Sequence, residues 1–150
     1  ACFIGHELIN RSIYTNLAKK LEKNVDSLIK QGIIYFGCGA FEGFDQLAGM
    51  TVLNARKSNP GIRLIIVLPC KQQDFLFSGA NTRTYKDLIA NADKVVYVTE
   101  KFSKNCVDKR NQHLINNSSI CVTYMKHIQS NIGQTVRLAQ ESGLTVINLA

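Results

Sequence analysis

The chain has 150 residues, of which 45% are hydrophobic and 19% charged, and its formal net charge is +7. This length is most simply one domain, 1–150, with room for a sizeable core, and the composition is not that of a disordered protein. The longest apolar runs, such as 64–69, are too short to span a bilayer, so we expect a cytoplasmic protein without membrane contact.

Short apolar runs alternate with stretches of helical spacing along the chain. We predict strands at 1–4, 33–36, 63–68, 95–98, 120–124 and 145–149, and helices at 10–31, 44–58, 84–90, 106–117 and 133–142. Residues 69–82 show no clear period and are predicted to form a long loop. The strands are apolar on both faces, which suits a parallel sheet covered on both sides. The pattern therefore predicts an α/β three-layer sandwich with a mostly parallel six-stranded sheet.

The five cysteines and the basic character bear on cofactors and partners. The cysteines form no CxxC pair and no metal-ligand spacing, so we expect reduced thiols, no metal and no cofactor. A positive net charge permits an acidic partner, either a phosphorylated small molecule or nucleic acid. The lysines are spread along the chain, and a generally basic surface is the simpler interpretation. Association into a homo-oligomer is left open.

The stretch from Gly37 to Gly43 is the first candidate binding site. In open α/β sheets ligands bind outside the carboxyl ends of the strands. There, a glycine loop between a strand and a helix can point backbone amides and the positive end of the helix dipole at a phosphate. Gly37, Gly39 and Gly43 would form such a cradle, although their spacing matches neither a dinucleotide fingerprint nor a Walker loop. An empty turn explains the glycines equally well.

Polar residues near the same edge supply further candidates. Gly5 and His6 follow the first strand, and His6 could exchange a proton or bind a phosphate, with a structural histidine as the simpler interpretation. Asp45, in the first turn of a helix, could accept hydrogen bonds from a ribose or a base, or only complement the helix dipole. Arg110 could pair with a phosphate. Asn111 shares a helix face with core residues, so its amide must bond either the structure or a ligand.

A second polar helix start lies near the end of the chain. It contains Ser130, Asn131, Gly133 and Thr135, and it could hold an anion or simply cap the helix. The chain shows no Ser/His/Asp order, no HExxH box and no paired carboxylates at a suggestive spacing.

Seven short motifs in register resemble the YpsA-like branch of the SLOG superfamily. They are Phe3-Ile4-Gly5-His6, the loop Gly39 to Asp45, Ile66-Val67-Leu68-Pro69, Tyr85 followed by Ala92-Asp93-Lys94-Val95, Lys109-Arg110-Asn111, Asn117-Ser118, and Thr135-Val136-Arg137-Leu138-Ala139. The resemblance implies a Rossmann-like fold and binding of nucleotides or nucleotide-derived ligands. The superfamily also contains the Lonely Guy phosphoribohydrolases and the single-stranded-DNA-binding DNA-processing protein A.

Two departures from the family pattern affect the expected chemistry. Glu7 stands where members often carry arginine, so a cation at the ligand edge is replaced by an anion. Thr135 stands where the Lonely Guy pattern has its glutamate, which makes hydrolysis less favoured.

Three functional hypotheses follow from the sequence. The first is a binding protein for a nucleotide-like small molecule. The second is an N-glycosidase acting on nucleoside monophosphates, with Asp45 or Glu42 as its carboxylate. The third is a module that binds single-stranded nucleic acid, which we rank last because no row of aromatic residues is available for stacking.

Overall fold

The computed structural model describes residues 1–71 and 81–150, which contain six strands and five helices. The strands are β1 (Cys2–Gly5), β2 (Tyr35–Cys38), β3 (Arg63–Cys70), β4 (Lys94–Thr99), β5 (Ile120–Tyr124) and β6 (Thr145–Asn148). The helices are α1 (Arg11–Lys30), α2 (Phe44–Arg56), α3 (Asn81–Asn91), α4 (Cys106–Asn116) and α5 (Asn131–Glu141). Strands and helices alternate in the predicted order.

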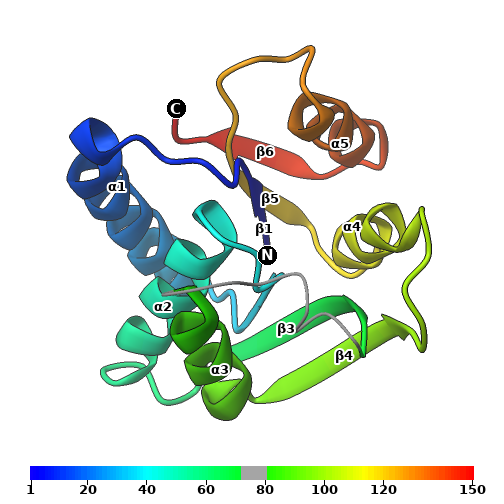
Figure 1. Ribbon diagram of the computed structural model, residues 1–150. Helices are drawn as coiled ribbons and strands as arrows, with labels where there is room; N and C mark the ends of the chain where they lie inside the picture. Colours follow the sequence, from blue (N-terminus) through cyan, green and yellow to red (C-terminus); the bar gives the residue numbers. More distant parts are fainter. Residues whose placement is uncertain (72–80) are drawn as a thin grey trace.

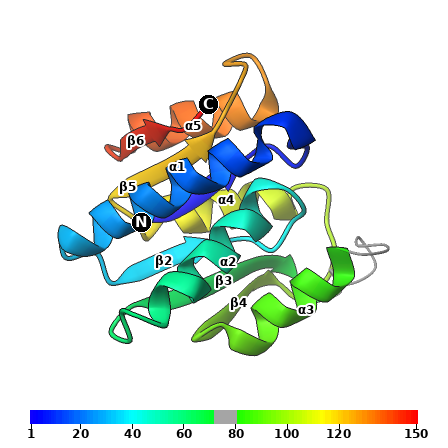
Figure 2. The same cartoon turned by 90° about the vertical axis from the view of Figure 1, so that its left-hand side faces the viewer.

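The six strands form one sheet in the order β4-β3-β2-β1-β5-β6, and every neighbouring pair is parallel. Helices α1, α2 and α3 cover one face of the sheet, and α4 and α5 cover the other (Figures 1 and 2). The chain builds outward from β1 to β4, then returns through α4 to pair β5 with the other side of β1. The topological switch point thus lies between β1 and β5. The predicted α/β sandwich is confirmed.

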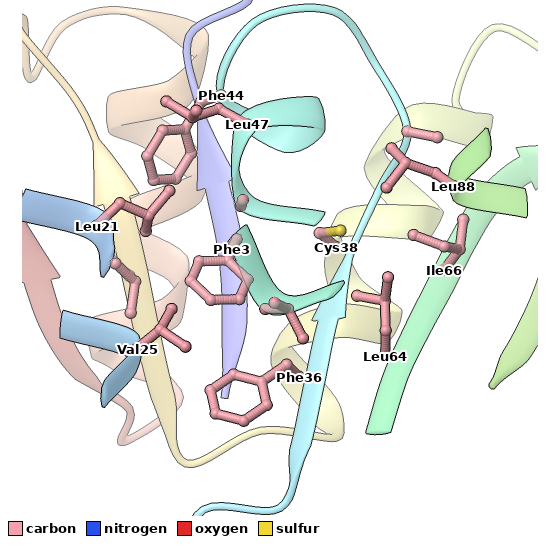
Figure 3. Close-up of a cluster of buried hydrophobic side chains, with 14 of the residues drawn as sticks. Phe3, Leu21, Val25, Phe36, Cys38, Phe44, Leu47, Leu64, Ile66 and Leu88 are labelled. Carbon is pink, nitrogen blue, oxygen red and sulfur yellow. The ribbon is translucent and has the colours of Figure 1, made fainter. Parts of the chain in front are cut away.

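Strand residues alternate between two buried apolar layers. On β1, Phe3 packs in the layer below α1 and α2, while Cys2 and Ile4 pack below α4 and α5. Figure 3 shows the first layer, in which the rings of Phe3 and Phe36 stack with centroids 6.1 Å apart. Burial on both faces explains why these strands are apolar without polar alternation.

The second strand corrects one predicted boundary. We expected it at 33–36 with Gly37 opening a loop, but β2 runs from Tyr35 to Cys38 and includes Gly37. The Gly37 amide donates to the Ala1 carbonyl at 2.9 Å, and Gly37 is in register with Ile65 of β3. A side chain at this position would press against Leu114 of α4. Gly37 therefore serves the packing of a helix on the sheet, not a turn.

Other boundaries also differ from the prediction, most of them by one or two residues. Helix α5 begins at Asn131, before the predicted 133, because the Ser130 hydroxyl caps it by accepting from the Gly133 amide. In the predicted loop 69–82, Pro69 and Cys70 belong to β3 and α3 already begins at Asn81. The rest of that loop, 72–80, lies outside the described residues.

Candidate functional site

A crevice of about 1010 Å³ opens at the carboxyl edge of the sheet, next to the switch point. Its walls are formed by the end of β1 and the residues after it, the loop between β2 and α2 with the first turn of α2, the loop before α4, helix α4, and helix α5. Its lining consists of Gly5, Glu7, Phe41, Glu42, Asp45, Phe102, Val107, Asp108, Arg110, Asn111, Gln112, Asn131, Ile132, Gln134, Thr135 and Leu138. Ligands of open parallel sheets bind in such a position.

A buried ion pair joins the two faces of the sheet at this crevice. Arg110 of α4 donates from Nη1 to Oδ2 of Asp45 of α2 at 2.9 Å, and both side chains are only 6% exposed. Helices α2 and α4 lie on opposite faces of the sheet (Figure 1), so the pair can form only where both reach its carboxyl edge. The two sequence candidates thus bind each other.

The remaining contacts of Arg110 hold its guanidinium in place. Nε and Nη2 donate to Oδ1 of Asn111 at 3.1 and 2.6 Å. The Phe41 ring lies under the guanidinium, with its centroid 4.7 Å from Cζ. Arg110 is therefore fixed by an aspartate, an amide and an aromatic ring, all of which line the crevice.

Asp45 has an unusual ionisation for an aspartate that faces an arginine. Burial raises its pKa to about 6, and this effect outweighs the opposing effect of Arg110. The nearby Glu7 carboxylate raises the pKa further, whereas the Phe41 amide, which donates to Asp45, lowers it. A carboxyl group that titrates near pH 6 in a cleft marks a candidate functional site.

Two glycines allow the chain to come this close. A side chain at Gly39 would collide with both Arg110 and Asp45, so the loop can pass the ion pair only without a Cβ. Gly43 caps α2 with a φ of 80°, and a Cβ there would meet the Glu7 carbonyl. Of the predicted cradle, Gly39 and Gly43 border this arrangement, while Gly37 lies inside β2 and does not line the crevice.

The amides of the β2–α2 loop are already in part engaged within the protein. The Phe41 amide donates to the Asp45 carboxylate. The Phe44 amide donates to the His6 carbonyl at 3.1 Å. Asp45 thus occupies the place of a bound anion in this loop, which favours α5 over the loop as the anion-binding end of the site.

The start of α5 adjoins a second, smaller hollow of about 500 Å³. His6, Lys126, His127 and Ser130 are among its lining residues. Gly133 allows α5 to approach the preceding loop, because a Cβ there would meet the Ile128 carbonyl. This hollow borders the crevice, since Glu7, Asn131 and Ile132 line both.

His6 lies in this hollow as an uncharged imidazole. Its Nε2 accepts from the Lys126 amide at 3.2 Å. Burial lowers its pKa, as do the neighbouring His127 and Lys126. His6 is thus an acceptor that orders the β5–α5 loop, and its second ring nitrogen carries the proton.

The charges of the two hollows differ. Glu7, Glu42, Asp45 and Asp108 line the large crevice together with Arg110, which Asp45 already pairs. Of these carboxylates only Glu7 also lines the small hollow, where Lys126 and the amino end of α5 oppose its charge. The crevice thus suits groups that donate hydrogen bonds, and the small hollow suits an anion.

Comparisons with known proteins agree with the motifs. A family model described as the YspA SLOG family (YpsA) matches residues 8–142. The chain belongs to this family. It is 28% identical over 141 residues to the uncharacterized SPbeta prophage-derived protein YoqJ of Bacillus subtilis, covering 85% of this chain and 82% of YoqJ. It is 25% identical over 87 residues to the UPF0398 protein BH1768 of Halalkalibacterium halodurans, covering 58% and 46%. The predicted SLOG membership is confirmed.

Two solved structures share the fold of this SLOG chain. DNA processing protein A of Helicobacter pylori, described for its single-stranded DNA binding mode, superposes with a TM-score of 0.71 at 20% identity. DNA processing protein A of Streptococcus pneumoniae superposes with a TM-score of 0.68 at 18% identity. Each match covers 98% of this chain, but only 63% and 48% of the solved chains. The chain thus spans less than two thirds of either.

Seven of the candidate residues from the sequence line the large crevice: Gly5, Glu42, Asp45, Arg110, Asn111, Asn131 and Thr135. His6 and Ser130 line the small hollow, and Gly133 supports it. The sequence reasoning did not single out Asp108, Gln112 and Leu138. Helical spacing could have found them, because 108 lies one turn before both 111 and 112, and 138 lies one turn beyond Thr135.

Within 1–71 and 81–150, no group of three or more histidine, cysteine, aspartate or glutamate side chains is arranged to hold a metal ion. In the same part of the chain, no helix combines the length and apolarity that crossing a membrane requires. All five cysteines are buried free thiols.

Proposed function

We propose that this SLOG protein binds a nucleotide or a related phosphorylated metabolite at the carboxyl edge of its sheet. The observation that carries the proposal is the junction of the two hollows at the switch point. A crevice of about 1010 Å³, near the upper end of the usual size of small-molecule sites, adjoins the hollow formed by Lys126 and the start of α5. The phosphate would bind near Lys126 and the free amides of the first turn of α5, and the base and sugar would enter the crevice.

A thermal-shift panel of nucleotides and sugar nucleotides tests the proposal. A ligand at about 100 times its Kd stabilises the folded protein by about 2.7 kcal/mol. Replacing Lys126→Met should weaken binding of phosphorylated compounds, whereas Lys23→Met, on the exposed surface of α1, serves as a matched control. If the melting temperature of the folded protein rises with none of the compounds, the proposal is contradicted.

N-glycosidic hydrolysis is a second candidate, because Glu42 and Asp45 both line the crevice. Asp45, with its pKa near 6, could donate a proton to a leaving base. Incubation with nucleoside monophosphates should then release free base, and both Glu42→Gln and Asp45→Asn should be tested. Equal activity in both variants and in the wild type would remove these assignments.

Single-stranded nucleic acid is a third candidate ligand. The net charge of +7 and the fold shared with DNA processing protein A support it. It predicts affinity for a single-stranded oligonucleotide that falls steeply with salt. No binding at low salt would eliminate it.

A further inference from the structure

The carboxamide of Asn111 has only one orientation that its neighbours permit. Arg110 approaches it with two nitrogens, Nε at 3.1 Å and Nη2 at 2.6 Å. A guanidinium group only donates hydrogen bonds, so the amide atom that it contacts must be the oxygen, Oδ1. The amide nitrogen, Nδ2, is therefore turned away from Arg110.

That nitrogen remains available to a ligand. Asn111 is only 7% exposed, and it lines the large crevice. Within the described residues, Nδ2 has no hydrogen-bond partner. It is also not fully buried, so it remains accessible from the crevice. Its two N–H groups thus reach the crevice, where an acceptor of a ligand could take the place of water.

The orientation is preset because Arg110 itself cannot easily turn. Asp45 binds its Nη1, the Phe41 ring covers its face, and the backbone at Gly39 packs directly against both Arg110 and Asp45. Because the Asn111 amide is already held in one orientation, a ligand that binds it pays a smaller entropic cost for ordering this side chain. Asp45, Arg110 and Asn111 form a chain that aims one donor.

The surrounding charges select the kind of acceptor. Glu42 and Asp108 line the crevice but not the small hollow, while the charge of Arg110 is balanced by Asp45. A phosphate oxygen would meet these carboxylates and be repelled, whereas a carbonyl or hydroxyl oxygen carries no net charge.

We propose that Asn111 is a specificity-determining residue that donates to an uncharged oxygen of the base or sugar of the ligand, and that Arg110 is the positioning residue that presets it. The inference rests on the proposed function, since it assumes that the phosphate of the ligand binds in the small hollow and its base and sugar bind in the crevice. It reassigns Arg110 from a phosphate contact, as the sequence predicted, to the support of its neighbour.

Nuclear magnetic resonance of the side-chain amide of Asn111 tests the assignment. The resonance is identified by its loss in Asn111→Asp, and it should move when an uncharged nucleoside is added but not when inorganic phosphate is added. In Arg110→Lys, a variant whose backbone spectrum reports its folding, the amide should become more mobile because the planar pair of donors is lost. A resonance that responds to phosphate alone, or an equally rigid amide in Arg110→Lys, would overturn the proposal.

A binding series separates this inference from the proposed function. Asn111→Asp keeps an acceptor for Arg110, removes the donor and adds one negative charge, to which an uncharged nucleoside presents no like charge. Nucleosides should therefore bind about tenfold more weakly, as expected for one lost hydrogen bond. Asn116→Asp, exposed on the same helix, is the matched control and should bind as the wild type does. Equal affinities of wild type and Asn111→Asp would overturn the inference and leave the proposed function standing. A wild type that binds neither nucleosides nor nucleotides would overturn both.

Discussion

Two aspartate–arginine pairs lie at opposite ends of the parallel strands. Their distances are similar, but their exposure to solvent and the pKa values of their aspartates differ. Arg110 and Asp45 meet at 2.9 Å beside the crevice, with both side chains 6% exposed. Arg56 and Asp93 meet at 2.6 Å where β3 and β4 begin, with side chains 25% and 27% exposed. Asp93 also accepts from the Leu64 amide at 2.8 Å. The same two residue types are thus used once in the interior and once near solvent.

The pKa values of the two aspartates move in opposite directions. Burial raises the pKa of Asp45 to about 6 in spite of Arg110. Burial also tends to raise the pKa of Asp93, but the Leu64 amide and Arg56 outweigh it, and the pKa is lowered. Solvent exposure, more than the presence of an arginine, decides the sign. The Arg56 pair links the end of α2 to the starts of β3 and β4. The buried pair costs free energy because both charges lose their hydration, and such perturbed buried charges are typical of functional sites.

Removing the buried arginine should have the largest effect. Arg110→Met leaves the buried Asp45 carboxylate without its cation and should lower the free energy of unfolding by about 3–5 kcal/mol at pH 8. The loss should shrink at pH 5, where Asp45 is protonated. Chemical denaturation at both pH values measures this, with Arg56→Met at the exposed pair as the control, expected to cost about 1 kcal/mol or less. Equal losses in the two variants would break the comparison.

The ionisation of Asp45 should be visible in the pH dependence of stability. Because its pKa is higher in the folded than in the unfolded chain, the folded state binds more protons between about pH 4 and pH 6. The contribution of Asp45 is fully present below its usual pKa and is lost as the pH rises through 6, by up to about 3 kcal/mol. The difference in unfolding free energy between wild type and Asp45→Asn should follow this curve.

Asp93 should show the reverse dependence. Its lowered pKa means that its contribution is present above its usual pKa and is lost as the pH falls through the folded value. If Asp45 and Asp93 contributed with the same sign, the difference in burial would not explain their ionisation.

Crowding the buried pair should have a smaller effect. Gly39→Ala places a methyl group against Arg110 and Asp45 and should cost about 1–3 kcal/mol through strain. Gly61→Ala is the matched control, since a Cβ there meets nothing within 4 Å, and its stability should stay within about 0.5 kcal/mol of the wild type. Thermal unfolding of both variants checks this, and a Gly39→Ala variant as stable as the control would show that the pair has room to shift.

The exposed pair should give the smallest change. Asp93→Asn keeps an acceptor for the Leu64 amide but removes the charge that faces Arg56, and should cost about 1 kcal/mol at pH 7. Added salt should reduce this cost, because the pair is open to solvent, and should leave the effect of Arg110→Met nearly unchanged. Urea unfolding with and without 0.5 M salt, an ionic strength well above about 0.1 M, measures the difference.

The candidate site could be predicted residue by residue but not as an arrangement. Asn111 was found because a polar residue on an apolar helix face is a local pattern. Its dependence on Arg110, and the pairing of Arg110 with Asp45, 65 residues earlier, could not be found in the same way. That pairing requires α2 and α4, on opposite faces of the sheet, to reach the same point of its carboxyl edge, which spacing along the chain does not encode. The role of Gly37 was predicted wrongly for the same reason, because its neighbour Leu114 comes from α4.

The sequence by itself determined the class and order of the elements. Apolar runs and helical spacing are local signals, and the predicted strand 120–124 coincides with β5. The tertiary structure alone decided the strand order, the switch point between β1 and β5, and the burial of Asp45 with Arg110. These features arise from contacts between distant segments, and burial sets the ionisation of a carboxylate only after those segments have packed.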